Sequence, residues 1–173
     1  LDFFSVNDFN ESEVDLALEK RYPEMKKKEH ESQFLKYEIN GIKTQFLRFK
    51  YPMLKGIEVI EGIKMYSVDD VIAGKMAAVV NRTEKRDFFD INEILKEKKL
   101  EEVLKIFDKK FNEKNTEQIL KSLINFEEAE NQRSIKSLNN TSWEQVKSNI
   151  SQKVNSYVQE LSKTKRRNRG FEM

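Results

Sequence analysis

The sequence predicts an α+β fold in which a small, largely antiparallel sheet precedes a helical C-terminal half. Strand-like apolar runs and a hairpin dipeptide, Asn40-Gly41, lie in the first 66 residues, and apolar residues at helical spacing begin after Ser67. Runs of strands followed by runs of helices are typical of α+β chains. We therefore predict two regions, a partial sheet over 1–66 and a helical region with a basic tail over 67–173.

The first region begins with a short strand over residues 1–5. Asn10 is a suitable N-cap for a helix from Glu11 to Tyr22, and Pro23 follows its end. The apolar positions of this helix are Val14, Leu16, Leu18 and Tyr22.

Two strands, 34–39 and 42–49, are predicted on either side of Asn40-Gly41. A type I′ turn needs positive φ at both central residues, and this dipeptide supplies it. A further strand pair, 57–60 and 63–66, is expected to complete the same sheet.

The second region starts with a helix capped by Ser67, whose core stripe is Val68, Ile72, Met76 and Val79. Three helices follow, over 87–98, 100–111 and 116–131. A last helix is predicted from Ser142 to about Lys163, and its apolar face is Trp143, Val146, Ile150, Val154, Tyr157 and Leu161.

Composition excludes several classes of protein. The 173 residues are 38% hydrophobic and include 12 Phe, which is enough for a core. The absence of cysteine excludes disulfides and thiolate metal sites and is consistent with a reducing cytoplasm. No apolar run approaches the roughly 20 residues of a membrane helix, and no signal peptide is visible. A cytoplasmic location without membrane contact is therefore expected.

Charge gives only a local indication of nucleic acid. The formal net charge is +2 although 36% of the residues are charged, so the two signs nearly balance. Residues 163–173 are an exception, with five basic residues and one acidic residue. Two interpretations of this tail stay open, a solvated helix end and a contact with RNA phosphates.

His30, the one histidine, is predicted to be an exposed strand residue without a His, Cys or fixed carboxylate partner.

Two cations are predicted to project from one side of the helix that begins after Ser67. Lys75 and Arg82 lie seven residues apart, and Asp87 and Asp90 follow. A lysine point charge and an arginine fork together suit a triphosphate. The alternative is a solvated helix face, with Asp87 and Asp90 in the first turn of the next helix.

Three segments resemble the AbiEii/AbiGii toxin family, which has the DNA polymerase β-like nucleotidyltransferase fold. Leu1-Asp2-Phe3-Phe4-Ser5 is similar to the end of its D-x-D-F-F-S motif, and residues 41–52 are similar to a later strand. The most specific segment is 67–90, which contains Lys75, Arg82 and Asp87. The resemblance extends over at least residues 1–150.

This resemblance implies roles for individual residues. Asp2 would be the second metal-binding carboxylate and a catalytic residue, and Lys75 and Asp87 would be catalytic. Lys75 and Arg82 would bind the nucleotide. The sequence departs from the family at Gln45, which stands where a carboxylate is usual. The first metal-binding Asp and a Gly-Gly-Ser/Thr motif that holds phosphates would precede Leu1, so the chain is expected to start inside the motif.

The implied function is transfer of a nucleoside monophosphate from an NTP to RNA or protein, with Mg²⁺ as cofactor and an antitoxin as protein partner. Such a protein would be the toxin of a toxin–antitoxin or phage-defence system. A second class stays open, since Gln45 and the incomplete first motif also suit a non-catalytic domain that binds a partner or nucleic acid.

Overall fold

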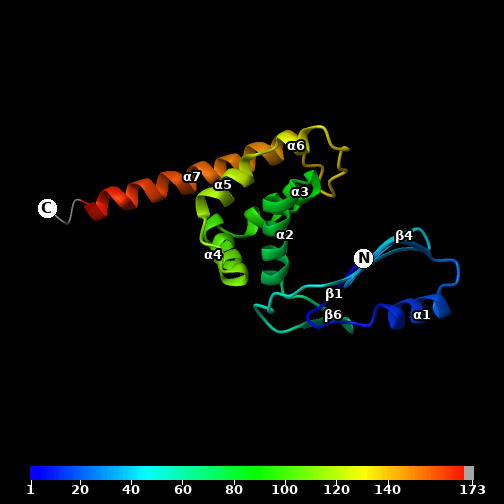
Figure 1. Cartoon of the computed structure of the whole chain (residues 1–173). Coiled ribbons are helices and arrows are strands. Elements are labelled where there is room, and N and C mark those ends of the chain that lie inside the picture. Colours follow the sequence, from blue (N-terminus) through cyan, green and yellow to red (C-terminus); the bar gives the residue numbers. More distant parts are fainter. Residues whose placement is uncertain (170–173) are drawn as a thin grey trace. The chain divides into compact units, whose positions relative to one another are not determined.

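The computed structural model divides into two compact units, Leu1–Pro52 and Met53–Met173, and each is described by itself (Figure 1). It describes the backbone of residues 1–169 and the side chains of residues 1–164. The first unit holds a sheet and one helix, and the described part of the second holds a small hairpin and six helices. The α+β class predicted from the sequence is confirmed.

A four-stranded sheet forms the first unit. Its order is β1 (Asp2–Ser5), β4 (Ile42–Arg48), β3 (Phe34–Ile39) and β2 (Lys26–Glu31). β1 runs parallel to β4, and the other two pairs are antiparallel. The β3–β4 turn has φ of 50° at Asn40 and 77° at Gly41, so the predicted hairpin is confirmed.

Helix α1 (Glu11–Arg21) covers one face of this sheet. Its predicted cap is confirmed, because the Asn10 side chain accepts hydrogen bonds from the backbone of the first turn. Val14 and Leu18, one helical turn apart, pack on buried residues of β3. Leu16 was predicted to belong to the same apolar set, but it is exposed. Two residues correspond to about 200° around a helix, so Leu16 lies on the side opposite Val14.

Strand β2 was predicted only through His30 and not from apolar pattern, because its sequence, KKKEHE, has no apolar residue. It forms through pairing with β3, and Lys36 Nζ of β3 lies 2.8 Å from Glu29 Oε2 of β2. A lysine-rich strand suits a sheet edge, where charge opposes pairing with other chains.

His30 is exposed as predicted, but Asp15 Oδ2 lies 3.6 Å from its Nδ1, so the expectation of no carboxylate partner was wrong.

Strands β5 (Glu58–Ile60) and β6 (Ile63–Met65) pair only with each other. Their prediction as strands is confirmed, but their expected place in the main sheet was wrong. The turn between them, Glu61-Gly62, has positive φ at both residues and specifies local pairing. Each strand has only three residues, and the turn between them favours their pairing with each other, not with a strand of the main sheet.

Six helices make up the rest of the described second unit. They are α2 (Val68–Arg82), α3 (Lys85–Glu97), α4 (Leu100–Phe111), α5 (Thr116–Ile124), α6 (Glu127–Glu130) and α7 (Trp143–Arg169). α2 packs against α3 and α4, and α7 packs against α3 and α5 (Figure 1). The predicted Ser67 cap is confirmed, since Ser67 Oγ accepts a hydrogen bond from the backbone of Asp70.

The helix predicted over 116–131 is two helices, α5 and α6. Asn125 ends α5 with an extended backbone, and its side-chain oxygen accepts a hydrogen bond from Glu127 N. An Asn side chain competes with helical bonds in this way. The break allows Phe126 to pack near Phe88 and Trp143.

Two residues of the predicted apolar stripes are exposed. Val68 lies in the first turn of α2, beyond the packed positions Ile72, Met76 and Val79. Leu161 lies on the part of α7 that follows the last buried position, Val154. A periodic pattern identifies a helix face, but it does not show how far neighbouring elements cover that face.

Candidate functional site

Asp2 lies on the face of the sheet opposite α1. In the parallel β1–β4 pair Asp2 is in register with Gln45, and Gln45 is in register with Lys36 on β3. Their neighbours Phe3, Phe46 and Leu35 point to the α1 side, because side chains alternate along strands. Asp2, Gln45 and Lys36 therefore form a row across the face that no element of residues 1–52 covers.

The oxygen ligands in this row are few. Asp2 supplies a carboxylate and Gln45 supplies an amide oxygen on the adjacent strand. Among the described side chains no three His, Cys, Asp or Glu gather as a metal site would require. Mg²⁺ is often held by one or two carboxylates together with substrate phosphates and water. The pair fits an ion that arrives with a nucleotide, and it is too small to hold one alone.

The second predicted set of residues comes together in the second unit. Asp87, on α3, is fully buried and accepts hydrogen bonds from two cations of α2: Lys75 Nζ at 3.2 Å and Arg82 Nε at 3.0 Å. A second bond from Arg82 Nη2 makes the arginine contact forked. Asp90 Oδ2 lies 2.6 Å from Lys75 Nζ. These four residues are called the cation cluster below.

The sequence placed Lys75 and Arg82 on one side of a helix, and the cluster shows what they face. Positions 75 and 82 lie two turns apart on α2, and the buried Asp87 on α3 accepts from both. Burial lowers the pKa of Lys75, but the hydrogen bond to Asp90 and the charges of Asp90 and Asp87 outweigh it. The net pKa lies above the ordinary value of 10.5, so Lys75 is a cation at neutral pH.

A second buried ion pair supports the start of α2. Asp70 Oδ1 lies 2.6 Å from Lys110 Nζ of α4, and both side chains are at most 1% exposed. Asp70 also accepts hydrogen bonds from Ser67 Oγ and Leu54 N. The pair was not predicted from the sequence, although Lys110 stands seven residues after the buried Val103 on α4. A lysine at a core position is the signal that predicts a buried cation.

Comparison with known proteins identifies the family. Residues 52–164 match the sequence model of the nucleotidyl transferase AbiEii toxin of type IV toxin–antitoxin systems. The chain belongs to the AbiEii family. The matched residues include the whole cation cluster, whereas Asp2 lies outside them.

Two individual proteins are similar to this AbiEii family member. An uncharacterized protein of Aquifex aeolicus is 29% identical over 125 residues, which are 70% of this chain and 60% of that protein. The chain thus spans about 60% of the length of this curated relative. The crystal structure of JHP933 from Helicobacter pylori matches all of the chain and 81% of its own chain, with a TM-score of 0.51 and 16% identity. That likeness shows a shared fold.

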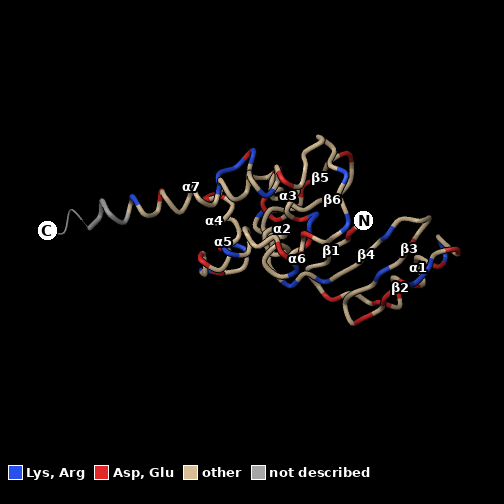
Figure 2. Tube along the Cα trace, turned by 90° about the horizontal axis from the view of Figure 1, so that it is seen from above, with Lys and Arg blue, Asp and Glu red and all other residues tan. Residues whose placement is uncertain are grey.

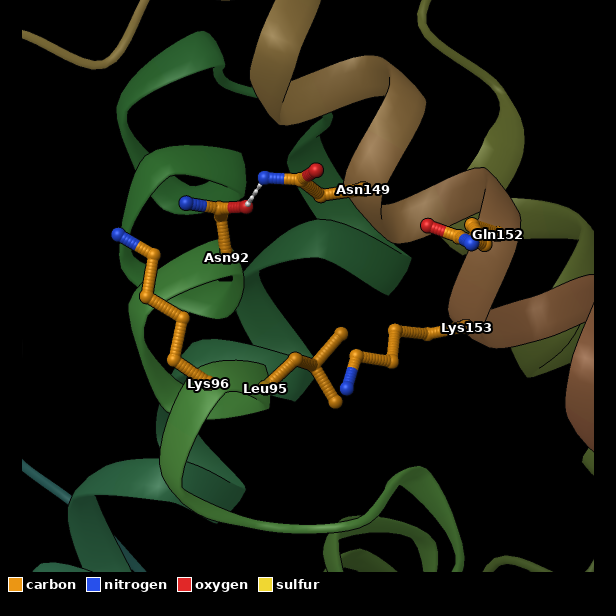
Figure 3. A pocket seen from close by; sticks show the side chains of 6 residues that line it. All are labelled: Asn92, Leu95, Lys96, Asn149, Gln152 and Lys153. Atoms are coloured by element: carbon orange, nitrogen blue, oxygen red, sulfur yellow. Dashed lines mark hydrogen bonds between the residues drawn. The ribbon is translucent and has the colours of Figure 1, made fainter.

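The cavity in Figure 3 lies between α3 and α7, and no residue of the cation cluster lines it. Its volume is about 210 Å³, and it is lined by Asn92, Leu95, Lys96, Asn149, Gln152 and Lys153. Asn149 Nδ2 donates to Asn92 Oδ1 at 3.0 Å across the two helices, and Lys96 is paired with Glu93. These contacts are those of a polar groove between packed helices.

Charges of both signs alternate along the chain in both units (Figure 2). The basic tail predicted over 163–173 lies largely outside the described side chains, which end at residue 164. Within residues 1–169 no helix is apolar and long enough to cross a bilayer.

Proposed function

We propose that this AbiEii family member transfers a nucleoside monophosphate from an NTP to an RNA or protein acceptor and releases pyrophosphate. Transfer joins an acceptor oxygen to the α-phosphorus, breaks the bond from that phosphorus to the leaving pyrophosphate, and releases the acceptor proton. The cation cluster carries the proposal, because two cations held on one buried carboxylate lie inside the segment that matches the family.

In this proposal Lys75 and Arg82 bind the phosphates. Their side chains are 32% and 47% exposed, so a ligand can reach both, although Asp90 also contacts Lys75 and Glu84 lies 3.8 Å from Arg82 Nε. Asp87 acts as a positioning residue, because its oxygens are occupied by the two cations it holds. Cations fixed before the substrate arrives stabilise developing charge without reorganising at the moment of reaction.

The proposed metal ligand is Asp2, with the Gln45 amide beside it. A bound Mg²⁺ would neutralise phosphate charge and act as a Lewis acid there. The proposed protein partner is an antitoxin, as the type IV description of the family suggests.

We expect Gln45→Asp to strengthen binding of Mn²⁺, a probe for Mg²⁺, by roughly tenfold. Neighbouring strands are about 5 Å apart. A second negative charge about 5 Å from a divalent ion adds about 1.7 kcal/mol even in water. Metal titration followed by electron paramagnetic resonance would measure this. Gln45→Asn is the matched neutral control, and equal affinities for the Asp and Asn variants would remove the metal role from this row.

Nucleotidyl transfer is tested with the complete gene product and two NTP substrates, one labelled in the α-phosphate and one in the γ-phosphate. Label in the α-phosphate of an NTP is expected to enter the acceptor fraction, and label in the γ-phosphate is expected to leave as pyrophosphate. RNA and protein acceptors are separated by nuclease and protease digestion. Transfer of the γ-label instead would identify a phosphotransferase, and transfer of neither label would favour the non-catalytic alternative.

A further inference from the structure

Lys75 has two carboxylate partners that differ in burial. Asp87 is 0% exposed, whereas Asp90, one turn later on α3, is 47% exposed. The exposed partner is also the nearer one, at 2.6 Å against 3.2 Å. The same ammonium group therefore contacts one carboxylate that is buried and one that water can reach.

Asp87 is sufficient to hold Lys75 in place. It is fixed by the forked contact from Arg82 and by burial in the α2–α3 interface. A buried carboxylate with charge-assisted hydrogen bonds is costly to separate from its cations. Lys75 would keep this anchor if its other contact were lost.

Asp90 is free to leave. Within the described residues Lys75 is its sole ion-pair partner, and water can solvate its carboxylate when that contact opens. The pair is partly solvated, with side chains 32% and 47% exposed, and water screens such a pair, so it contributes little to stability. A phosphate oxygen that approaches Lys75 therefore competes with a weakly held anion, not with the buried one.

We propose that Asp90 is a built-in competitor for the phosphate site, occupying the Lys75 ammonium until a polyphosphate displaces it. This proposal rests on the phosphate-binding role of Lys75 in the proposed function. Asp90 thereby weakens binding and keeps the cation neutralised when no nucleotide is present.

The test is binding of inorganic tripolyphosphate to the 173-residue chain by calorimetry at low ionic strength, without metal. Asp90→Asn is expected to tighten binding by about 2- to 5-fold, the equivalent of the partly solvated ion pair that it removes. Glu93→Gln is the matched control, because it removes one negative charge from an exposed ion pair one turn further along α3. Lys75→Ala is the third variant, and circular dichroism checks that each variant is folded.

The outcomes separate the two proposals. If Lys75→Ala weakens binding and Asp90→Asn tightens it beyond the control, both proposals are supported. If Lys75→Ala weakens binding but Asp90→Asn matches the control or also weakens it, Asp90 is a bystander or a positioning residue, and only the competitor role is overturned. If Lys75→Ala has no effect, the phosphate role of Lys75 is overturned, and the competitor role with it.

Discussion

Replacing Lys75 by alanine in the complete gene product is expected to slow nucleotidyl transfer by roughly 10²–10³-fold. This is the usual effect of removing one preorganised electrostatic stabiliser. The reason is that Lys75 is held by Asp87 and Asp90, and its side chain is 32% exposed, so a phosphate can reach the ammonium. Single-turnover transfer measures the effect on the phosphoryl step without product release.

Stability must be measured with the same variant. Lys75 lies beside the predicted core stripe of α2 and not on it, and a substitution at such a position typically costs less than about 0.5 kcal/mol. The contact with buried Asp87 raises the expected cost to about 1–3 kcal/mol, the range for a lost hydrogen bond to a charged group. Thermal unfolding checks this value.

Two further variants make the activity result specific. Lys75→Arg is expected to restore transfer only in part, because a planar guanidinium differs from an ammonium in shape and reach. Lys105→Ala is the control, since Lys105 pairs with Glu101 on an exposed helix face. A transfer rate unchanged in Lys75→Ala, or a variant that does not fold, would show that Lys75 is solvated or structural.

Asp70→Asn is expected to lower the free energy of unfolding by about 3–5 kcal/mol. The change removes the carboxylate that faces Lys110 Nζ at 2.6 Å, and breaking a buried ion pair by removal of one partner typically costs that much. Urea unfolding at neutral pH measures the change. Asp69→Asn is the matched control, because Asp69 pairs with the exposed Lys55, and about 1 kcal/mol or less is expected there.

A double variant distinguishes charge from packing. Asp70→Leu with Lys110→Met replaces the buried pair by apolar groups, which is often neutral or stabilising. Recovery should be incomplete here, because Leu54 N and Ser67 Oγ also bond to Asp70. A double variant no more stable than Asp70→Asn would show that the hydrogen bonds lost with the carboxylate outweigh what is gained by removing the unmatched charge.

The same residue gives stability a dependence on acid. Burial raises the pKa of Asp70, but hydrogen bonds from Lys110, Ser67 and the backbone of Leu54 outweigh it, so its folded pKa lies below the ordinary 3.8. A depressed folded pKa means that the contribution is complete above the unfolded pKa and is lost as the pH falls through the folded pKa. The difference in stability between the native protein and Asp70→Asn should therefore shrink below about pH 4.

Local signals were enough to predict most elements. Asn10 and Ser67 cap the helices that follow them, and Asn40-Gly41 turns the β3–β4 hairpin. The two caps are hydrogen bonds to backbone N–H groups two or three residues later, and the turn depends on the φ angles of its own two residues. The failure at 116–131 also concerns a local signal, because Asn125 accepts from the backbone two residues later and interrupts a helix that apolar spacing alone predicted as continuous.

The candidate site was predictable only in part. The sequence by itself determined that Lys75 and Arg82 share a side of α2, because helical geometry relates positions on one element. Tertiary structure decided that Asp87 is buried between them, that Asp90 reaches the same ammonium, and that Gln45 stands beside Asp2. It also paired Asp70 with Lys110, 40 residues away, and made a strand of the charged segment Lys26–Glu31. These contacts join residues whose distance in space depends on how separate elements pack, and no periodicity within one element encodes that distance.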